Sequence, residues 1–374
     1  MASNRVNGTP HVEAGAALAV SGGKARSAAA GRSRYSTDSV RRNLRYSRRG
    51  VAGRLAYWSL KESGDRCDFD RVNFCGSALA DRVSIVSDGE KCWPTGVAAC
   101  GSVWVCPVCC AKIKARRAVE IELLCDAHAG AGGSFSMLTA TVRHDRSQSL
   151  EDVRGAVALS WRKVQRLKSW ADLRQLIVGQ VVAPEVTVGE NGWHPHLHVL
   201  LFARPGVGED ALNSSLVSLR CDWLRLVNEC LGKSPSVDRG VHLLHFGADS
   251  MAAAAGYLSK VAKELTGGEL KSGRDPFALL DAAGDGDSKA IAQWFEYAKA
   301  MKGVRSVAFS AQLRDTYGVV QLEDEEVAVL DENAGVEVCW VASETWNRAL
   351  REGAIGDFLS ELELSLDPLI RLSG

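Results

Sequence analysis

A strand with histidine at alternate positions constrains the fold of this chain more than any other feature. The stretch from His194 to Phe202 reads HPHLHVLLF, with three histidines in its first half and an apolar second half. In a β-strand, residues two apart point to the same face, so His194, His196 and His198 project together. Imidazole rings at that spacing can share one divalent cation. The alternative is a strand whose histidines are only solvated or hydrogen-bonded.

The segment before this strand predicts a hairpin that adds an acid to the histidine face. Residues 181–192 read as a strand and a tight turn, the turn being signalled by an Asn-Gly pair. A turn centred on that pair places Thr187 opposite His196 and Glu185 opposite His198. The predicted ligands of a divalent ion are therefore Glu185, His196 and His198, although a slip of one residue would turn Glu185 to the other face.

A second set of candidate ligands lies upstream, where cysteines are dense. Cys106-Pro107-Val108-Cys109 is a C-x-x-C motif, and two thiolates at this spacing on a tight turn can both reach one zinc ion. The predicted structural zinc site consists of Cys75, Cys100, Cys106 and Cys109. Cys67 and Cys92 are alternatives for the fourth position. A redox-active C-x-x-C and scattered buried cysteines are the competing interpretations.

The chain carries no net charge, but its two ends differ strongly. Residues 1–54 contain eleven Lys and Arg against two Asp and Glu, whereas residues 322–374 contain three against thirteen. The basic end lacks hydrophobic periodicity and is predicted to be a disordered arm over residues 1–52. Its arginine cluster, between Arg41 and Arg49, either contacts nucleic acid phosphates or is simply solvated.

Length and cysteine usage indicate an intracellular globular protein. The 374 residues suffice for two or three structural units, and no apolar run reaches the roughly 18 residues of a membrane helix. Eleven cysteines without a recognisable secretory signal favour reduced thiols over a disulfide framework. We therefore expect a cytoplasmic protein with no membrane partner.

Hydrophobic periodicity predicts an α+β fold in which helices flank an antiparallel β-sheet. The predicted strands are 135–143, 181–188, 194–202, 241–246 and 304–310, and the predicted helices are 111–129, 150–170, 210–231, 251–265 and 289–301. The predicted organisation is a basic arm (1–52), an N-terminal cysteine-rich zinc-binding segment (53–130), the α+β domain (131–320) and an acidic appendage (321–374). His242 and His245, three apart in one strand, should face opposite sides.

The predicted helix at 251–265 presents a tyrosine and a lysine on one face. Tyr257 and Lys260 are one turn apart. Taken alone, such a tyrosine is more often a packing residue, and a tyrosine is a poor nucleophile at its usual pKa near 10. A nearby cation or a metal-bound phosphate would make it useful in catalysis.

Three motifs in this order resemble those of the HUH endonuclease superfamily, and more closely the single-tyrosine initiators of rolling-circle plasmid replication. Residues 137–141 (MLTAT) resemble the first motif, a mostly structural strand. Residues 194–198 (HPHLH) resemble the second, and residues 257–260 (YLSK) resemble the third. Residues 100–109 also resemble a cysteine segment found in this family on actinobacterial plasmids. The similarity covers roughly residues 70 to 320.

The resemblance implies an HUH endonuclease core that nicks and rejoins single-stranded DNA. Glu185, His196 and His198 would hold Mg²⁺ or Mn²⁺ at the scissile phosphate, and Tyr257 would attack that phosphate with the help of Lys260. The products would be a 5′-phosphotyrosine and a free 3′-hydroxyl that primes synthesis. The implied substrate is single-stranded or supercoiled plasmid origin DNA, and the implied partners are a host helicase and a DNA polymerase.

Two other functions remain open from the sequence. Within the superfamily, the chain could be a transposase or a relaxase. From another class, it could be a zinc-containing DNA-binding regulator without catalysis.

The chain also departs from relatives that carry a glutamate four residues before the tyrosine, because that position is Ala253. The group that activates water at termination is therefore open, with Asp249 and Glu264 as substitutes by helix geometry only.

Overall fold

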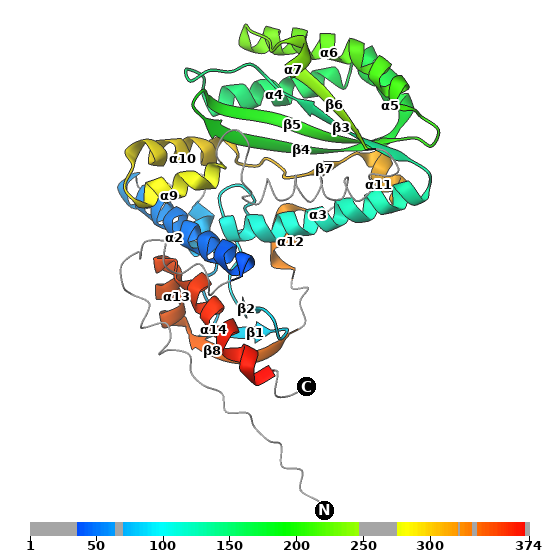
Figure 1. The fold of residues 1–374 in the computed structure, drawn as a ribbon. Helices are drawn as coiled ribbons and strands as arrows, with labels where there is room; N and C mark the ends of the chain where they lie inside the picture. Colours follow the sequence, from blue (N-terminus) through cyan, green and yellow to red (C-terminus); the bar gives the residue numbers. More distant parts are fainter. Residues whose placement is uncertain (1–35, 64–69, 247–274, 321, 331–334, 371–374) are drawn as a thin grey trace, which may run out of the picture. The chain divides into compact units, whose positions relative to one another are not determined.

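The computed structural model describes residues 36–63, 70–246, 275–320, 322–330 and 335–370 (Figure 1). The chain divides into two compact units. The larger unit comprises residues 101–105 and 110–328, and the smaller unit comprises residues 1–100, 106–109 and 329–374. Among the described residues, no helix combines the length and the apolar character needed to cross a membrane.

The larger unit is an α+β structure, as predicted. Its elements in chain order are α3 (Pro107–Gly130, from Cys110 onward), β3 (Ser134–Ala140), α4 (Leu150–Val164), α5 (Lys168–Leu176), β4 (Ile177–Gly189), β5 (Gly192–Ala203), α6 (Glu209–Leu231), α7 (Val237–Gly240), β6 (Val241–Phe246), η3 (Pro276–Ala278), α9 (Leu279–Gly284), α10 (Ser288–Ala300), β7 (Ala308–Phe309), α11 (Ala311–Tyr317) and α12 (Asp324–Val329).

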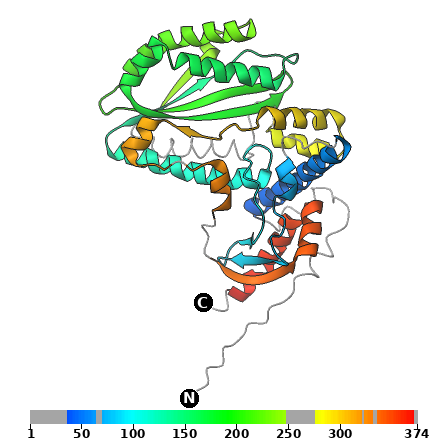
Figure 2. The same ribbon diagram turned by 180° about the vertical axis from the view of Figure 1, so that it is seen from behind.

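A five-stranded sheet with the order β6-β3-β5-β4-β7 organises this unit, and all neighbouring strands are antiparallel. Helices cover both faces (Figures 1 and 2). One face contacts α4, α5 and α6 through a core that includes Leu138, Val199 and Trp223. The other face contacts α3 and α11 through a core that includes Phe202 and Leu313. Because side chains alternate along each strand, the even-numbered residues of β5 belong to the α3 and α11 face.

The structure differs from the predicted elements in one helix, which is divided in two, and in two strands, which are shorter than predicted. The helix predicted at 150–170 is two helices, which end and begin around residues 165–167. Their separation lets Trp161 and Trp170 meet edge to face within one core, with ring centroids 5.1 Å apart. Strand β3 ends at Ala140, and β7 has only two residues. The helix predicted at 251–265 lies outside the described residues.

The smaller unit contains a three-stranded antiparallel sheet with the order β2-β1-β8. Its elements are α2 (Thr37–Ser63), η1 (Asp70–Phe74), β1 (Arg82–Ser87), β2 (Cys92–Thr95), β8 (Val336–Ala342), α13 (Ser343–Glu352) and α14 (Ile355–Ile370). One sheet face packs against α13 and α14 through a core that includes Ile85, Val341, Trp346 and Phe358. The predicted acidic appendage therefore shares a core with residues near the N-terminus.

The prediction of a disordered arm was wrong for residues 37–52, which form the first part of helix α2. The helix is stabilised by contacts that local periodicity does not reveal. The guanidinium of Arg42 donates to both carboxylate oxygens of Glu363, at 2.5 and 2.7 Å. Arg49 is buried and donates to the backbone carbonyls of Val72 and Asn73. These arginines therefore stabilise the smaller unit, and basic and acidic segments at opposite ends of the chain fold together.

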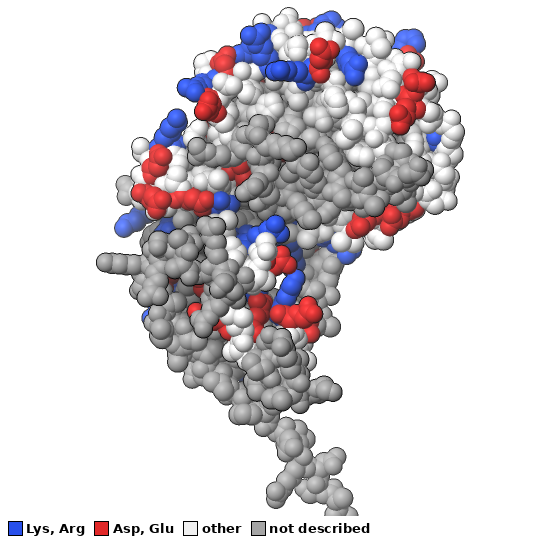
Figure 3. Space-filling view, viewed as in Figure 1, with Lys and Arg blue, Asp and Glu red and all other residues white. Residues whose placement is uncertain are grey.

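Charges on the described part of the face drawn in Figure 3 are mixed rather than separated. Figure 3 shows Lys and Arg interspersed with Asp and Glu over the described part of the visible face. This mixture agrees with the equal numbers of acidic and basic residues in the chain, 45 of each.

Candidate metal centres

The β4–β5 hairpin brings a glutamate and two histidines together on the sheet face that contacts α3 and α11. Glu185 lies on β4 directly opposite His196 on β5, and His198 follows two residues later on the same face. The carboxylate oxygen Oε2 of Glu185 lies 2.9 Å from Nε2 of His196 and 2.7 Å from Nε2 of His198. The two Nε2 atoms are 3.0 Å apart. Three potential ligand atoms therefore converge on one point, as predicted.

The register of the hairpin differs from the prediction by two residues. The turn contains only Glu190 and Asn191, so Gly189 pairs with Gly192. Gly192 has a φ of +90°, a conformation that glycine adopts without strain. The prediction that Glu185 lies opposite His198 was therefore wrong. A shift of two residues keeps every side chain on the same face, so the three groups still meet.

Burial makes this group unusual for ionisable side chains. Glu185 is 7% exposed and His198 is 8% exposed. Burial opposes ionisation of the Glu185 carboxyl, but hydrogen bonds from His196 and His198 outweigh it and hold its pKa well below the ordinary value. The carboxylate is thus charged and close to two imidazoles, and together they form a group that could hold a metal ion.

His194 lies beside this group but outside it. Its Nδ1 is 2.8 Å from Nε2 of His144, which lies in the loop after β3. Burial, followed by the nearby His196 and His144, lowers the pKa of His194 to about 4. His144 was missed from the sequence, because a loop residue has no periodic pattern that would assign it to this face.

Strand β3 contributes a further contact to the group. Thr139 pairs with His198 across the β3–β5 ladder, and its Oγ1 lies 3.2 Å from Nδ1 of that histidine. Thr139 belongs to the motif at residues 137–141, which was interpreted from the sequence as mostly structural. The neighbouring strand β6 carries two more histidines, and their side chains point to opposite sides of the sheet, as predicted. His242 pairs with Thr139, and His245 contacts Ser136.

The predicted nucleophile and its lysine lie outside the described residues. Tyr257 and Lys260 fall within 247–274, so their positions relative to Glu185, His196 and His198 stay a prediction. Asp249, Ala253 and Glu264 fall in the same range.

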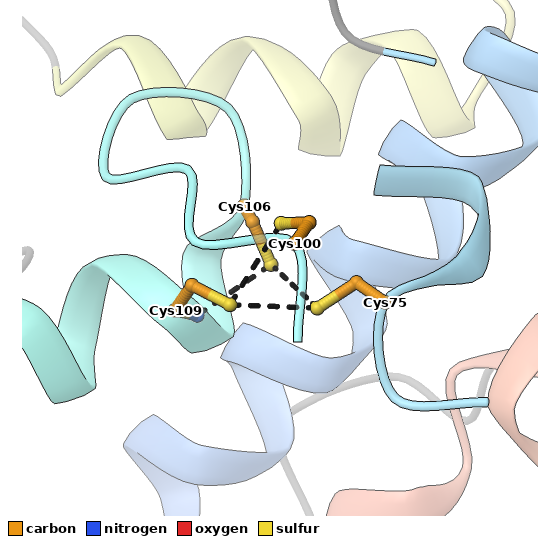
Figure 4. A group of neighbouring side chains, drawn as sticks. All are labelled: Cys75, Cys100, Cys106 and Cys109. Carbon is orange, nitrogen blue, oxygen red and sulfur yellow. Dashed lines mark hydrogen bonds between the residues drawn. The ribbon is translucent and has the colours of Figure 1, made fainter. Parts of the chain in front are cut away.

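Four cysteines of the smaller unit form a second group that could hold a metal ion. Their side chains point toward one another from three places in the chain (Figure 4). Sγ of Cys75 lies 3.5 Å from Sγ of Cys106 and 3.5 Å from Sγ of Cys109, and Sγ of Cys100 lies 3.7 Å from that of Cys109. All four residues are buried, and they are the four that the sequence predicted.

The start of helix α3 explains how the C-x-x-C motif converges. Pro107 is the first residue of the helix, a position where its fixed φ is favourable and its missing N–H costs nothing. Cys106 and Cys109 therefore lie one turn apart, and the backbone N–H of Cys109 donates to Sγ of Cys106 at 3.5 Å. The local sequence alone brings these two sulfur atoms together.

Each thiol of the group affects the ionisation of its neighbours. Hydrogen bonds from Cys100, Cys106 and Cys109 hold the pKa of Cys75 below its ordinary value. The contact with Cys100, followed by those with Cys109 and Cys75, raises the pKa of Cys106. Several thiolates cannot coexist at this spacing unless a cation balances their charge.

The other cysteines considered for this site are accounted for differently. Cys92 lies in the hydrophobic core of the smaller unit together with Cys339. Cys110, next to the motif, is buried but does not belong to the four-cysteine group. Cys67 lies outside the described residues.

Comparison with known proteins assigns the chain to a family. A family model described as a replication protein matches residues 96–342. The chain belongs to this family of replication proteins. The match includes the hairpin with Glu185, His196 and His198, and three of the four clustered cysteines.

Curated relatives of this replication-protein chain come from bacteria. It is 28% identical over 297 residues to "Protein rep" of Streptomyces lividans, covering 60% of this chain and 64% of that protein. It is 31% identical over 133 residues to a "Neomycin resistance protein" of Streptomyces cyanogenus, covering 28% and 30%. It is 28% identical over 152 residues to "Protein rep" of Lentilactobacillus hilgardii, covering 38% and 45%. The chain thus spans less than two thirds of the length of these relatives, and no solved structure matches it.

Proposed function

We propose that this chain is the initiator of rolling-circle replication of a plasmid, and that it nicks and rejoins single-stranded DNA at the origin. The observation that carries the proposal is the convergence of Glu185, His196 and His198 on one sheet face in a chain of the replication-protein family. A DNA-binding regulator without catalysis would have no use for this buried group.

The ligand set supports Mg²⁺ or Mn²⁺ as the catalytic ion. Two imidazole nitrogens and one carboxylate oxygen suit Mn²⁺ well, since imidazole prefers transition metals and carboxylate suits Mg²⁺ and Mn²⁺. Three protein ligands leave open coordination positions for a phosphate oxygen and water. A cation held there would polarise the scissile phosphate and offset the charge that develops on it.

Tyr257 is the proposed nucleophile, on the strength of its motif. Its phenolic oxygen would form a bond to phosphorus as the bond from phosphorus to the 3′ oxygen breaks. The phenolic proton leaves, and the 3′ oxygen takes up a proton to become a free hydroxyl. The tyrosine keeps the 5′-phosphate, and a second strand transfer reverses these bonds when the strand is rejoined. Lys260, three residues further along the chain, would add positive charge beside the phosphate.

The four cysteines are proposed to bind a structural zinc ion. A regular tetrahedron with edges of 3.5–3.7 Å has its centre about 2.2 Å from each corner, close to the roughly 2.3 Å of a Zn–S bond. All four positions are filled by protein sulfur and all four residues are buried, which is typical of a structural rather than a catalytic zinc site. A redox function would need an accessible thiol pair.

The proposed substrate and partners follow from the reaction. A nicked origin presents a 3′-hydroxyl, which a host DNA polymerase extends while a host helicase separates the strands. The proposed DNA substrate is the plasmid origin in single-stranded or supercoiled form.

Formation of a covalent protein–DNA adduct tests the proposal. The protein is incubated with a single-stranded origin oligonucleotide and Mn²⁺, and the products are separated under denaturing conditions. We expect an adduct with the unaltered protein, none with Tyr257→Phe, and little with Glu185→Gln. Tyr57→Phe is the matched control, because Tyr57 is an exposed residue of α2 in the smaller unit.

Two outcomes would contradict specific parts of the proposal. Absence of an adduct with the unaltered protein and its own origin would refute covalent nicking and favour a non-catalytic regulator. An adduct that persists in Tyr257→Phe would show that another residue is the nucleophile.

A further inference from the structure

One contact of β3 with the group of Glu185, His196 and His198 involves a side chain that the proposed reaction does not use. Thr139 is half-buried, and its Oγ1 lies 3.2 Å from Nδ1 of His198. The two residues are cross-strand partners on the same face of the sheet. The contact is therefore fixed by the sheet itself and not by a mobile loop.

The direction of this hydrogen bond follows from the chemistry of a metal ligand. Nε2 of His198 is the ring nitrogen that faces Glu185 and His196, so it is the atom available to a cation. A neutral imidazole has one N–H, and a ligating nitrogen must carry the lone pair. The proton must then be on Nδ1, and this N–H can donate a hydrogen bond to the hydroxyl oxygen of Thr139.

We propose that Thr139 is a positioning residue that fixes the ring orientation and the tautomer of His198. Its hydroxyl oxygen accepts a hydrogen bond from the Nδ1–H group and leaves the Nε2 lone pair directed at the metal position. Outer contacts of this kind orient metal-binding histidines in many proteins, and their loss typically lowers metal affinity about 10- to 100-fold. The inference rests on the proposed metal site, but it does not depend on the identity of the nucleophile.

The neighbouring ligand provides a comparison within the same hairpin. Nδ1 of His196 lies 3.4 Å from the backbone carbonyl of His194, so the main chain can accept its proton. His198 instead relies on a side chain from another strand. A substitution can therefore remove the acceptor of His198 without altering the backbone around either ligand.

Strand β3 also supplies a matched control. On its opposite face, Oγ of Ser136 lies 2.8 Å from Nδ1 of His245, a histidine that is not part of either metal group. Ser136→Ala and Thr139→Val each remove one hydroxyl-to-histidine contact from β3, but only the second involves a proposed ligand. Valine keeps the branched shape and strand preference of threonine.

Two measurements test the proposal. The first is the Nδ1–H signal of His198 in protein labelled with ¹⁵N-histidine and saturated with Mg²⁺, observed by NMR. We expect this proton to be protected from exchange with water in the unaltered protein, in Thr139→Ser and in Ser136→Ala, and to exchange faster in Thr139→Val. The second is the affinity for Mn²⁺, measured from the electron paramagnetic resonance signal of free Mn²⁺. We expect it to fall about 10- to 100-fold in Thr139→Val only.

The outcomes separate this proposal from the proposed function. An Nδ1–H exchange rate and a Mn²⁺ affinity that are both unchanged in Thr139→Val would overturn the role of Thr139, even if the protein forms its DNA adduct normally. An equal loss of affinity in Thr139→Val and Thr139→Ser would also overturn it, because serine keeps the acceptor. If the unaltered protein binds no Mn²⁺, the metal site and the role of Thr139 fail together, whereas unchanged values in Thr139→Val overturn the role of Thr139 alone.

Discussion

Replacing Cys109 by alanine is expected to abolish zinc binding, while replacing the adjacent Cys110 is expected to preserve it. Cys109 lies within 3.7 Å, sulfur to sulfur, of both Cys75 and Cys100. Cys110 is equally buried but lies outside the group. Both variants lose one buried thiol from consecutive positions of helix α3, so they differ mainly in what the sulfur touches.

The size of the effect can be worked out from the geometry of the site. A complete set of four thiolates at a tetrahedral spacing resembles sites that contribute roughly 10–16 kcal/mol of apparent binding free energy in zinc-dependent peptides. With free zinc at only 100 times the dissociation constant, the bound ion stabilises the folded state by about 2.7 kcal/mol. For a unit of this size, such a loss lowers the Tm by roughly 5–10 °C.

Zinc content and thermal unfolding measure the two parts of this prediction. Metal analysis of the purified protein should give about one zinc per chain for the unaltered protein and for Cys110→Ala, and close to none for Cys109→Ala. A chelator should lower the Tm of the unaltered protein in thermal unfolding experiments. It should leave the Tm of Cys109→Ala unchanged. Equal zinc content in the two variants would refute the assignment of Cys109 as a ligand. Absence of zinc from the unaltered protein would refute the site as a whole.

Three further predictions concern the larger unit. Glu185→Gln should remove the increase in Tm that saturating Mn²⁺ gives the unaltered protein, since the neutral amide is a weaker ligand than the carboxylate; a normal increase measured by thermal unfolding would contradict its role. Asp324→Asn should destabilise the protein by about 1–3 kcal/mol, because Asp324 accepts from the buried guanidinium of Arg117 and from Ser306, whereas Glu120 still pairs with that guanidinium. The control Glu323→Gln, in an exposed ion pair, should cost about 0–1 kcal/mol in the same chemical denaturation experiment. Finally, the pKa of His194 is lowered to about 4, so the unfolded state gains a proton that the folded state lacks as the pH falls from about 6.5. The free energy of unfolding of the metal-free protein should therefore fall by up to about 3 kcal/mol between about pH 6.5 and pH 4. In His194→Gln, the free energy of unfolding, measured by chemical denaturation, should depend less steeply on pH over this range.

Local patterns in the sequence predicted the parts of the structure that depend on residues close in the chain. Helix α6 and strand β6 lie where periodicity predicted them. The four clustered cysteines are the predicted set, and two of them belong to a C-x-x-C motif at a helix start, which leaves little freedom. Helix α2 was missed because its arginines are satisfied by partners such as Glu363, more than 300 residues away, and no local pattern reveals such partners.

The two metal groups show why side-chain faces are easier to predict than contacts. Alternation in a strand determines which side chains share a face, and this survives any even shift of register. Glu185 therefore lies beside His196 and His198, although the predicted register of the hairpin differs from the observed one by two residues. The acceptor for His198 depends instead on the strand order, because Thr139 contacts it only when β3 lies beside β5. Periodicity does not determine strand order, so the first motif was interpreted as structural until the sheet placed its threonine against a candidate ligand.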